Sequence, residues 1–206
     1  MKYIPYIILA VALLATGPMY LTVKKKNRDL GIFFKVLTTA LIASVTLFAK
    51  DKSAATWLFF GGLCVCAAAD ALLEYKFKVG MVVFLCAHLF YISAYILLGR
   101  VTAASAVIFA LLFAITLLLV KFKAEKSLKI VGIVYGAVIS AMVSLAVPYA
   151  FTQGSVLFAL GAILFFASDS VIALTLGKRN KLWMDILILV TYWGAQTLIA
   201  LAAYGV

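Results

Sequence analysis

Long apolar stretches separated by short polar turns run through the whole chain. An α-helix needs about 20 mainly apolar residues to cross the hydrocarbon core of a bilayer, and the stretches have about this length. The pattern therefore predicts an all-α fold of eight transmembrane helices. Their expected bounds are residues 4–23, 32–49, 54–74, 79–98, 101–120, 130–147, 154–176 and 182–204.

Three residues near helix ends affect these boundaries. A basic residue before an apolar run, as at Lys2, also begins a secretory signal peptide. Here the run is long and basic residues at 24–28 follow it, which indicates a retained membrane span. Pro148 is expected to end the sixth helix. Lys35, near the start of the second, is expected to extend its ammonium group toward the membrane surface.

Composition supports a membrane protein. Of the 206 residues, 67% are hydrophobic, whereas ordinary soluble chains contain about 45–50% apolar residues. The eight spans use nearly the whole chain, so no separate extramembrane domain fits. We expect a single transmembrane domain over residues 1–206.

The net charge of +11 is distributed unevenly between the loops. The exceptions to the pattern are Lys2, Lys50, Lys52 and Arg100; all other basic residues lie in or beside the first, third, fifth and seventh loops. Loops rich in lysine and arginine stay in the cytosol, so both termini are expected outside. No separate basic domain is present, which argues against nucleic-acid binding. The expected location is the inner membrane of a bacterium.

The cysteine and histidine content argues against metal binding and disulfide bonds. Cys64, Cys66 and Cys86 all lie inside apolar segments, and three is an odd number. His88 is the single histidine, and no CxxC motif accompanies it, so no familiar zinc ligand set is present. We expect no metal and no cofactor.

Ionisable residues inside the predicted spans are the first candidates for function, because they are costly in hydrocarbon. Asp70 and Asp169 each follow a glycine, Gly62 or Gly161, by eight positions. With a rise of 1.5 Å per residue, Asp70 lies about 6–9 Å and Asp169 about 10 Å from the cytosolic ends of their helices. Both aspartates are thus expected in the cytosolic half of the membrane.

Other polar residues follow helical spacing, which places them in stripes on one face of each helix. Such stripes must face a bundle interior or a wet cavity. Four converging stripes predict one polar chamber that opens toward the cytosolic leaflet. The stripes are Cys66, Asp70 and Glu74; His88, Tyr91 and Tyr95; Asp185, Tyr192 and Gln196; and Ser168, Asp169 and Ser170.

The same polar residues can also be interpreted as purely structural. The two aspartates could simply hydrogen-bond neighbouring helices, and His88 could bridge them. Glu74 and Asp185 lie close enough to the headgroups to be interfacial acids that pair with Lys76, Lys78, Lys178 or Arg179. Matching Asp70 to Asp169 and Tyr91 to Tyr192 is compatible with a repeat of four plus four helices in parallel, and also with chance.

Three ordered signatures in the chain resemble those of the lysoplasmalogenase family, the YhhN-like multi-pass membrane proteins. The first is Asp70-Ala-Leu-Leu, then Gly80 and His88-Leu-Phe-Tyr91. The second runs from Gly161 to Ser168-Asp169-Ser170, and the third is Thr191-Tyr192-Trp-Gly-Ala-Gln196. One position departs from the family pattern: Ala69 stands where the family usually has glycine.

The resemblance implies hydrolysis of the vinyl ether bond of lysoplasmalogens to a fatty aldehyde and glycerophosphoethanolamine or glycerophosphocholine. The expected partners are a lysophospholipid substrate and membrane lipids, with no obligate protein partner. We assign Asp70 and Asp169 as an acid and stabiliser pair that shares one proton. The expected substrate-binding residues are Glu74, His88, Tyr91, Ser168, Asp185, Tyr192 and Gln196.

Two other functions use the same polar chamber. A transporter of lipids or small solutes is one, although no pair of helices broken at mid-membrane supports alternating access. A metal-dependent, ceramidase-like lipid hydrolase is the other, and the single histidine argues against it.

Overall fold

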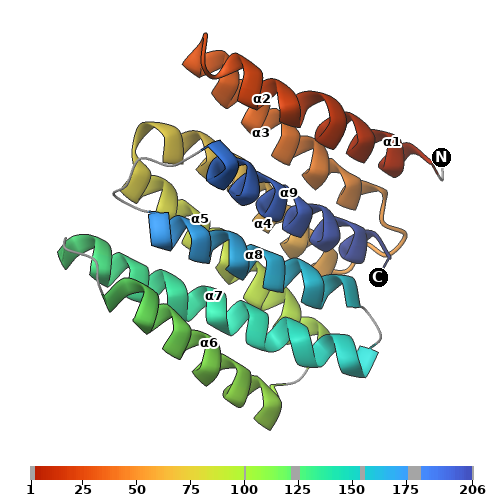
Figure 1. Cartoon of the computed structure of the whole chain (residues 1–206). Helices are drawn as coiled ribbons and strands as arrows, with labels where there is room; N and C mark the ends of the chain where they lie inside the picture. Colours follow the sequence, from red (N-terminus) through yellow and green to blue (C-terminus); the bar gives the residue numbers. More distant parts are fainter. Residues whose placement is uncertain (1–2, 100, 122–125, 154–155, 176–181, 206) are drawn as a thin grey trace. The chain divides into compact units, whose positions relative to one another are not determined.

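The computed structural model describes residues 3–99, 101–121, 126–153, 156–175 and 182–205 (Figure 1). Every regular element in these ranges is a helix. Eight helical spans within them are long and apolar enough to cross a membrane, which confirms the predicted all-α polytopic fold. Several basic residues used to predict orientation lie outside the described ranges, so the sidedness of the termini stays a prediction. They are Lys2, Arg100, Lys123, Lys178, Arg179 and Lys181.

The contacts divide the chain into two compact units. The first comprises Met1–Ala94 and Ala200–Val206, and the second comprises Tyr95–Ile199. The helix α5 (Phe77–Leu98) crosses the boundary near its end, and α9 (Leu182–Gly205) crosses it as well. The predicted parallel repeat and the single domain remain predictions, and each unit is described separately below.

In the first unit, the first membrane span is one continuous helix with a local irregularity. It consists of α1 (Ile4–Val11), a π-helical turn η1 (Ala12–Thr16) and α2 (Gly17–Val23). Proline has no backbone N–H and cannot donate to the preceding turn, so Pro18 accounts for the widened turn just before it. Thr16 in this turn hydrogen-bonds Thr38 of the next span, with 2.8 Å between the two hydroxyl oxygens.

The next two helices of the first unit begin at side-chain caps. The side chain of Asn27 accepts a hydrogen bond from the Leu30 amide (3.0 Å) at the start of α3 (Arg28–Ser44), which ends in a 3₁₀ turn, η2 (Val45–Phe48). Ser53 caps α4 (Ala54–Tyr75) in the same way. Helix α3 packs against α2 and α4.

Close approach between α4 and α5 depends on glycine. A Cβ atom added at Gly80 would lie 2.5 Å from the backbone nitrogen of Leu73, so only glycine fits here. Gly62 of α4 similarly lies against the ring of Tyr91 of α5. These contacts align α4 and α5 antiparallel, with Gly62 opposite Tyr91 and Leu73 opposite Gly80.

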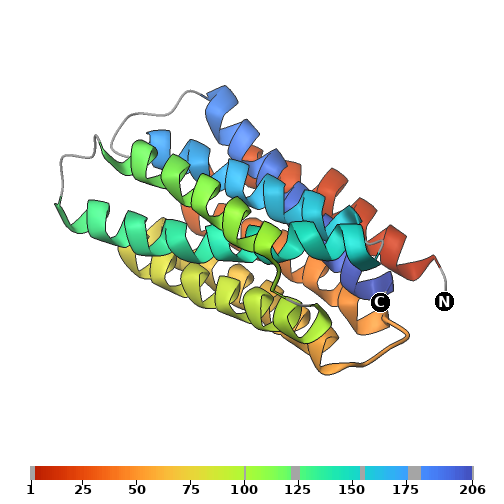
Figure 2. The same cartoon turned by 90° about the horizontal axis from the view of Figure 1, so that it is seen from below.

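The second unit contains α6 (Ala103–Lys121), α7 (Lys126–Gln153), α8 (Val156–Thr175) and most of α9. Helix α7 packs along both α6 and α8, and Figure 2 shows α6 and α7 side by side. A Cβ atom at Gly161 of α8 would lie 2.8 Å from Ile199 Cγ1 and 3.1 Å from the Ala195 carbonyl oxygen. Helices α8 and α9 therefore pack closely at Gly161.

The predicted end of the sixth span at Pro148 is wrong. Helix α7 continues through Pro148 to Gln153. Inside a bilayer no water is available for the backbone groups beyond the proline, so continuing the helix and losing one hydrogen bond is the better alternative. The Thr152 hydroxyl donates to the carbonyl oxygens of Pro148 (3.2 Å) and Tyr149 (3.1 Å) in the last turn.

Candidate functional site

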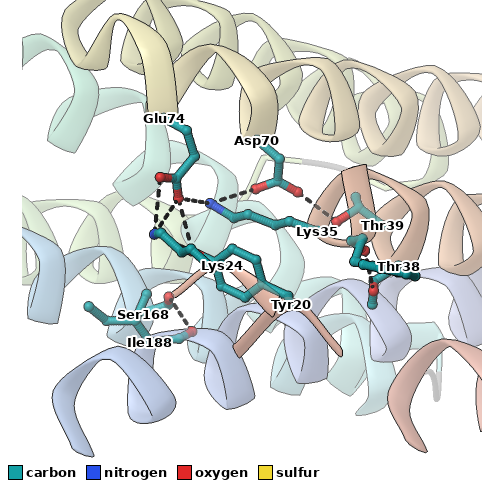
Figure 3. Close-up of polar contacts among 10 residues, drawn as sticks. Tyr20, Lys24, Lys35, Thr38, Thr39, Asp70, Glu74, Ser168 and Ile188 are labelled. Carbon is teal, nitrogen blue, oxygen red and sulfur yellow. Dashed lines mark hydrogen bonds and ion pairs between the residues drawn. The ribbon is translucent and has the colours of Figure 1, made fainter. Parts of the chain in front are cut away.

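Three helices of the first unit each contribute two polar residues, four positions apart, to one connected cluster. Residues four apart lie on the same face of a helix, one turn above each other. Figure 3 shows the resulting network, which we call the Asp70 cluster. Its members are Tyr20 and Lys24 at the end of α2, Lys35 and Thr39 on α3, and Asp70 and Glu74 on α4.

Asp70 is held from α3 by two side chains. The Thr39 hydroxyl donates a hydrogen bond to Asp70 Oδ2 over 2.6 Å. Lys35 Nζ lies 3.4 Å from Asp70 Oδ1. Asp70 is only 1% exposed, and a carboxylate without a cation would be unfavourable at such a position. The pairing with Lys35 therefore favours the ionised form of Asp70.

Lys35 does not extend to the surface as predicted. The residue is 8% exposed, and its ammonium lies between Asp70 and Glu74, 3.5 Å from Glu74 Oε1. Two carboxylates one turn apart on the neighbouring helix offer this cation a better environment than the membrane surface. A pattern along one helix does not contain this information, because both partners belong to α4.

Glu74 is engaged by residues of α2 as well. The Tyr20 hydroxyl donates to Glu74 Oε1 over 2.9 Å, and Lys24 Nζ lies 3.0 Å from Oε2. Lys24 also donates to the Tyr20 oxygen over 2.7 Å. Among the described residues, the cations paired with Glu74 are therefore Lys24 and Lys35; of the partners that the sequence suggested, Lys178 and Arg179 lie outside the described residues.

The predicted stripe on α5 faces the interior. His88, Tyr91 and Tyr95 are each at most 1% exposed. His88 Nδ1 lies 2.7 Å from the Phe84 carbonyl oxygen, which can only accept, so Nδ1 carries the hydrogen. The Tyr91 hydroxyl lies 3.5 Å from Cys66 Sγ, and this contact joins the stripes of α4 and α5.

In the second unit, Asp169 of α8 has a partner that the sequence analysis missed. The hydroxyl of Tyr135, on α7, donates to Asp169 Oδ2 over 2.6 Å. Among the described residues, no lysine, arginine or histidine forms an ion pair with Asp169. The available signal was a tyrosine inside the sixth span, with no polar residue three, four or seven positions from it in either direction. Asp169 is thus hydrogen-bonded, and within the described part of the chain it has no ion pair like that of Asp70.

Contacts between α8 and α9 define their relative heights. The Ser168 hydroxyl donates to the Ile188 carbonyl oxygen over 3.2 Å, as Figure 3 also shows. The ring of Phe165 lies edge-on to that of Tyr192, with 5.6 Å between centroids. The two helices therefore run antiparallel, with Asp169 near the level of Ile188.

This register places Gln196 at a different height from Asp169, although both were expected in one polar chamber. Gln196 lies eight positions beyond Ile188 on α9, which is about 12 Å along the helix axis. Gln196 is fully buried, and neither atom of its amide has a hydrogen-bond partner among the residues described. Tyr192, 5% exposed, lies between the two levels. Asp185 is half-buried in the first turn of α9, where a carboxylate favours the helix N-terminus.

The two candidate catalytic acids belong to different units, Asp70 to the first and Asp169 to the second. A pocket shared by both acids remains a prediction. What the geometry provides is one carboxylate paired with a buried cation and one hydrogen-bonded to a phenol. Such a difference in environment suits two acids that work in different protonation states.

Comparison with known proteins identifies one family. The model of the YhhN family matches residues 30–203, from the first turn of α3 to the last turns of α9. No curated protein and no solved structure is significantly similar to the chain.

Proposed function

Because the chain belongs to the YhhN family, we propose that it is a membrane hydrolase that cleaves the vinyl ether bond of lysoplasmalogens. The products are a fatty aldehyde and glycerophosphoethanolamine or glycerophosphocholine. Family membership, together with a hydrogen-bonded aspartate on each of two signature helices, carries the proposal. We further propose that the protein resides in a bacterial inner membrane and acts on lipids of the cytosolic leaflet.

The reaction needs a proton donor and a group that stabilises positive charge. Protonation of the β-carbon of the vinyl ether gives an oxocarbenium ion. Water adds to the cationic carbon and loses a proton, and the resulting hemiacetal collapses to aldehyde and alcohol. A carboxylate near the cation lowers the barrier to the first step, and a base lowers the barrier to water addition.

We assign Asp70 as the ionised carboxylate. Lys35 compensates its charge, and Thr39 fixes one of its oxygens. In this form, Asp70 stabilises the oxocarbenium ion and accepts the proton that the attacking water releases. Lys35 acts through Asp70 and is a positioning residue.

We assign Asp169 as the proton donor. A carboxyl group that lacks a paired cation is more favourable in its neutral form at membrane depth. The hydrogen bond from Tyr135 occupies Oδ2, which leaves Oδ1 to carry the proton that goes to the β-carbon. After one turnover Asp70 holds the proton taken from water and Asp169 is ionised, so a proton must pass from Asp70 to Asp169 before the next turnover; no net proton is consumed.

The remaining candidate residues line the proposed pocket. Ser168 lies next to Asp169, and Tyr192 lies about one helical turn from that level, toward Gln196. In the first unit, we assign the same substrate-binding role to His88 and Tyr91. The height of Gln196 fits a contact with the alkenyl chain region or with a buried water molecule rather than with the ether oxygen. Asp185 and Glu74 belong to the ends of their helices and fit the headgroup level.

The decisive experiment measures aldehyde release by the purified protein from a lysoplasmalogen and from its saturated alkyl-ether analogue. We expect aldehyde from the first substrate only. Asp70→Asn and Asp169→Asn should each abolish it while the protein stays folded. If either variant releases aldehyde at the parent rate, the assignment of that residue is wrong. Lipid flux into sealed vesicles without aldehyde would instead support the transporter.

A further inference from the structure

The outer part of the Asp70 cluster contains a partly exposed cation, Lys24. Lys24 forms two hydrogen bonds through its ammonium, to the Tyr20 oxygen (2.7 Å) and to Glu74 Oε1 (3.1 Å). The ammonium also lies 3.0 Å from Glu74 Oε2, so its protein partners are one phenol and one carboxylate, and the Lys24 side chain is still 39% exposed and open to a further ligand. Tyr20 is 5% exposed and Glu74 is tied to two lysines, so Lys24 is held in place by fixed partners.

The charge around Lys24 suits an anion. Within the cluster, the two positive charges of Lys24 and Lys35 equal the two negative charges of Asp70 and Glu74. Arg28 adds a further positive charge, since its guanidinium donates to the backbone carbonyl of Glu74. Asp29, which accepts a hydrogen bond from the Tyr75 hydroxyl, balances Arg28. The excess positive charge at this end of the first unit therefore comes from exposed lysines, and it favours an anionic ligand. These lysines are Lys25, Lys26, Lys76 and Lys78.

The spacing of the cluster matches one class of ligand. Asp70 lies one helical turn deeper than Glu74, which is four residues or about 6 Å along α4. In a 1-alkenyl glycerophospholipid, five covalent bonds separate phosphorus from the ether oxygen. An extended chain covers about 1.2 Å per bond, so the two groups are about 6 Å apart. A phosphate at Lys24 thus places the ether oxygen at the level of Asp70.

We propose that Lys24, oriented by Tyr20 and Glu74, is the binding site for the phosphodiester of the lysophospholipid substrate. The inference rests on the proposed function for the identity of the substrate. Tyr20 and Lys24 precede the residues that the family model matches, so the assignment comes from this chain's own contacts. Glu74 then serves to orient Lys24 and does not bind substrate directly.

The test compares a lysoplasmalogen with the corresponding 1-alkenylglycerol, which lacks the phosphate. We expect Lys24→Met to reduce the preference for the phosphorylated substrate, as the ratio of kcat/KM values, about tenfold, because a hydrogen bond to a charged group is lost. Lys24→Arg should retain most of the preference. Lys26→Met is the matched control, since Lys26 is exposed and outside the cluster, and it should leave the ratio within about twofold.

A binding measurement accompanies the kinetics. Affinity for the saturated 1-alkyl-ether lysophospholipid, which is not cleaved, should fall about tenfold in Lys24→Met and in Lys24→Gln. The glutamine variant keeps a hydrogen-bond donor near Tyr20 and covers the case in which the methionine variant does not fold. An unchanged preference together with unchanged affinity in both variants would overturn the proposal.

Two further outcomes distinguish the source of the phosphate and the fate of the proposed function. If inorganic phosphate displaces the alkyl-ether lipid at similar concentrations, the site takes free phosphate and the headgroup assignment is wrong. If the parent protein releases no aldehyde from either substrate yet binds the alkyl-ether lipid in a Lys24-dependent manner, the hydrolase proposal fails and the phosphate site stands.

Discussion

Replacing Lys35 by methionine tests how the Asp70 cluster works. Methionine has a similar length but no charge, so Lys35→Met takes the cation away from the buried Asp70, while Glu74 keeps its ion pair with Lys24. At the observed distances of 3.4 Å to Asp70 and 3.5 Å to Glu74, each Coulomb interaction amounts to about 5 kcal/mol at an effective dielectric constant of about 20. Desolvation of the ammonium offsets much of this attraction.

The net loss of stability on breaking a buried pair from one side is about 3–5 kcal/mol. The loss is smaller if Asp70 takes up a proton, because a neutral carboxyl group needs no cation. A neutral Asp70, however, no longer stabilises the oxocarbenium ion. We therefore expect the rate of aldehyde release to fall by about 100-fold or more, comparable with removal of one electrostatic stabiliser elsewhere. Lys35→Arg keeps the charge and should retain substantial activity.

A double-mutant cycle separates the role of Lys35 from general destabilisation. Lys35→Met combined with Asp70→Asn leaves no unpaired charge at Asp70. The double variant should be more stable than Lys35→Met in thermal unfolding, and its activity should equal that of Asp70→Asn alone, since both act on one carboxylate. Parent-level aldehyde release by a well-folded Lys35→Met variant would refute this reasoning.

Three other substitutions test separate contacts. Tyr135→Phe removes the hydrogen bond to Asp169 and should lower the rate of aldehyde release about 5- to 10-fold with a stability change near 1 kcal/mol; an unchanged rate would show that Asp169 acts without it. Gln196→Leu removes a fully buried amide that has no partner among the described residues, so thermal unfolding should show stabilisation of about 1–2 kcal/mol, and destabilisation would point to a bound water or ligand. Gly161→Ala places a methyl group against Ile199 and the Ala195 carbonyl and should destabilise by about 1–3 kcal/mol, whereas Gly194→Ala, whose nearest new contact is 3.7 Å away, is the control.

The sequence was sufficient for features that depend on one helix at a time. Span lengths follow from hydrophobic thickness, and the inward direction of His88, Tyr91 and Gln196 follows from helical spacing, because each helix presents one polar face. The environment of Asp70 required knowledge of a second helix. Its cation Lys35 lies 35 positions earlier in the chain, and only the packing of α3 on α4 brings the two together.

The same reasoning explains the other missed or wrong expectations. Tyr135 has no polar neighbour within two helical turns on its own face at the usual three, four or seven spacing, so no spacing rule distinguished it from the interfacial tyrosines. Its partner Asp169 lies on another helix. Pro148 is a helix terminator where water can satisfy the freed carbonyl groups, and an apolar surrounding changes that balance. In both cases the deciding factor is what surrounds the helix rather than its own residues.

The π-helical turn in the first span has a consequence for how that span tolerates changes in length. A π-turn holds one residue more than an α-helical turn. Deleting one residue within Ala12–Thr16 would convert the turn to a regular one and leave Tyr20 and Lys24 facing Glu74. Deleting one residue between Gly17 and Val23 would instead rotate Lys24 by about 100° around the axis, away from its carboxylate. The segment before Pro18 can thus lose one residue without moving Lys24 away from Glu74, whereas the segment after Pro18 cannot.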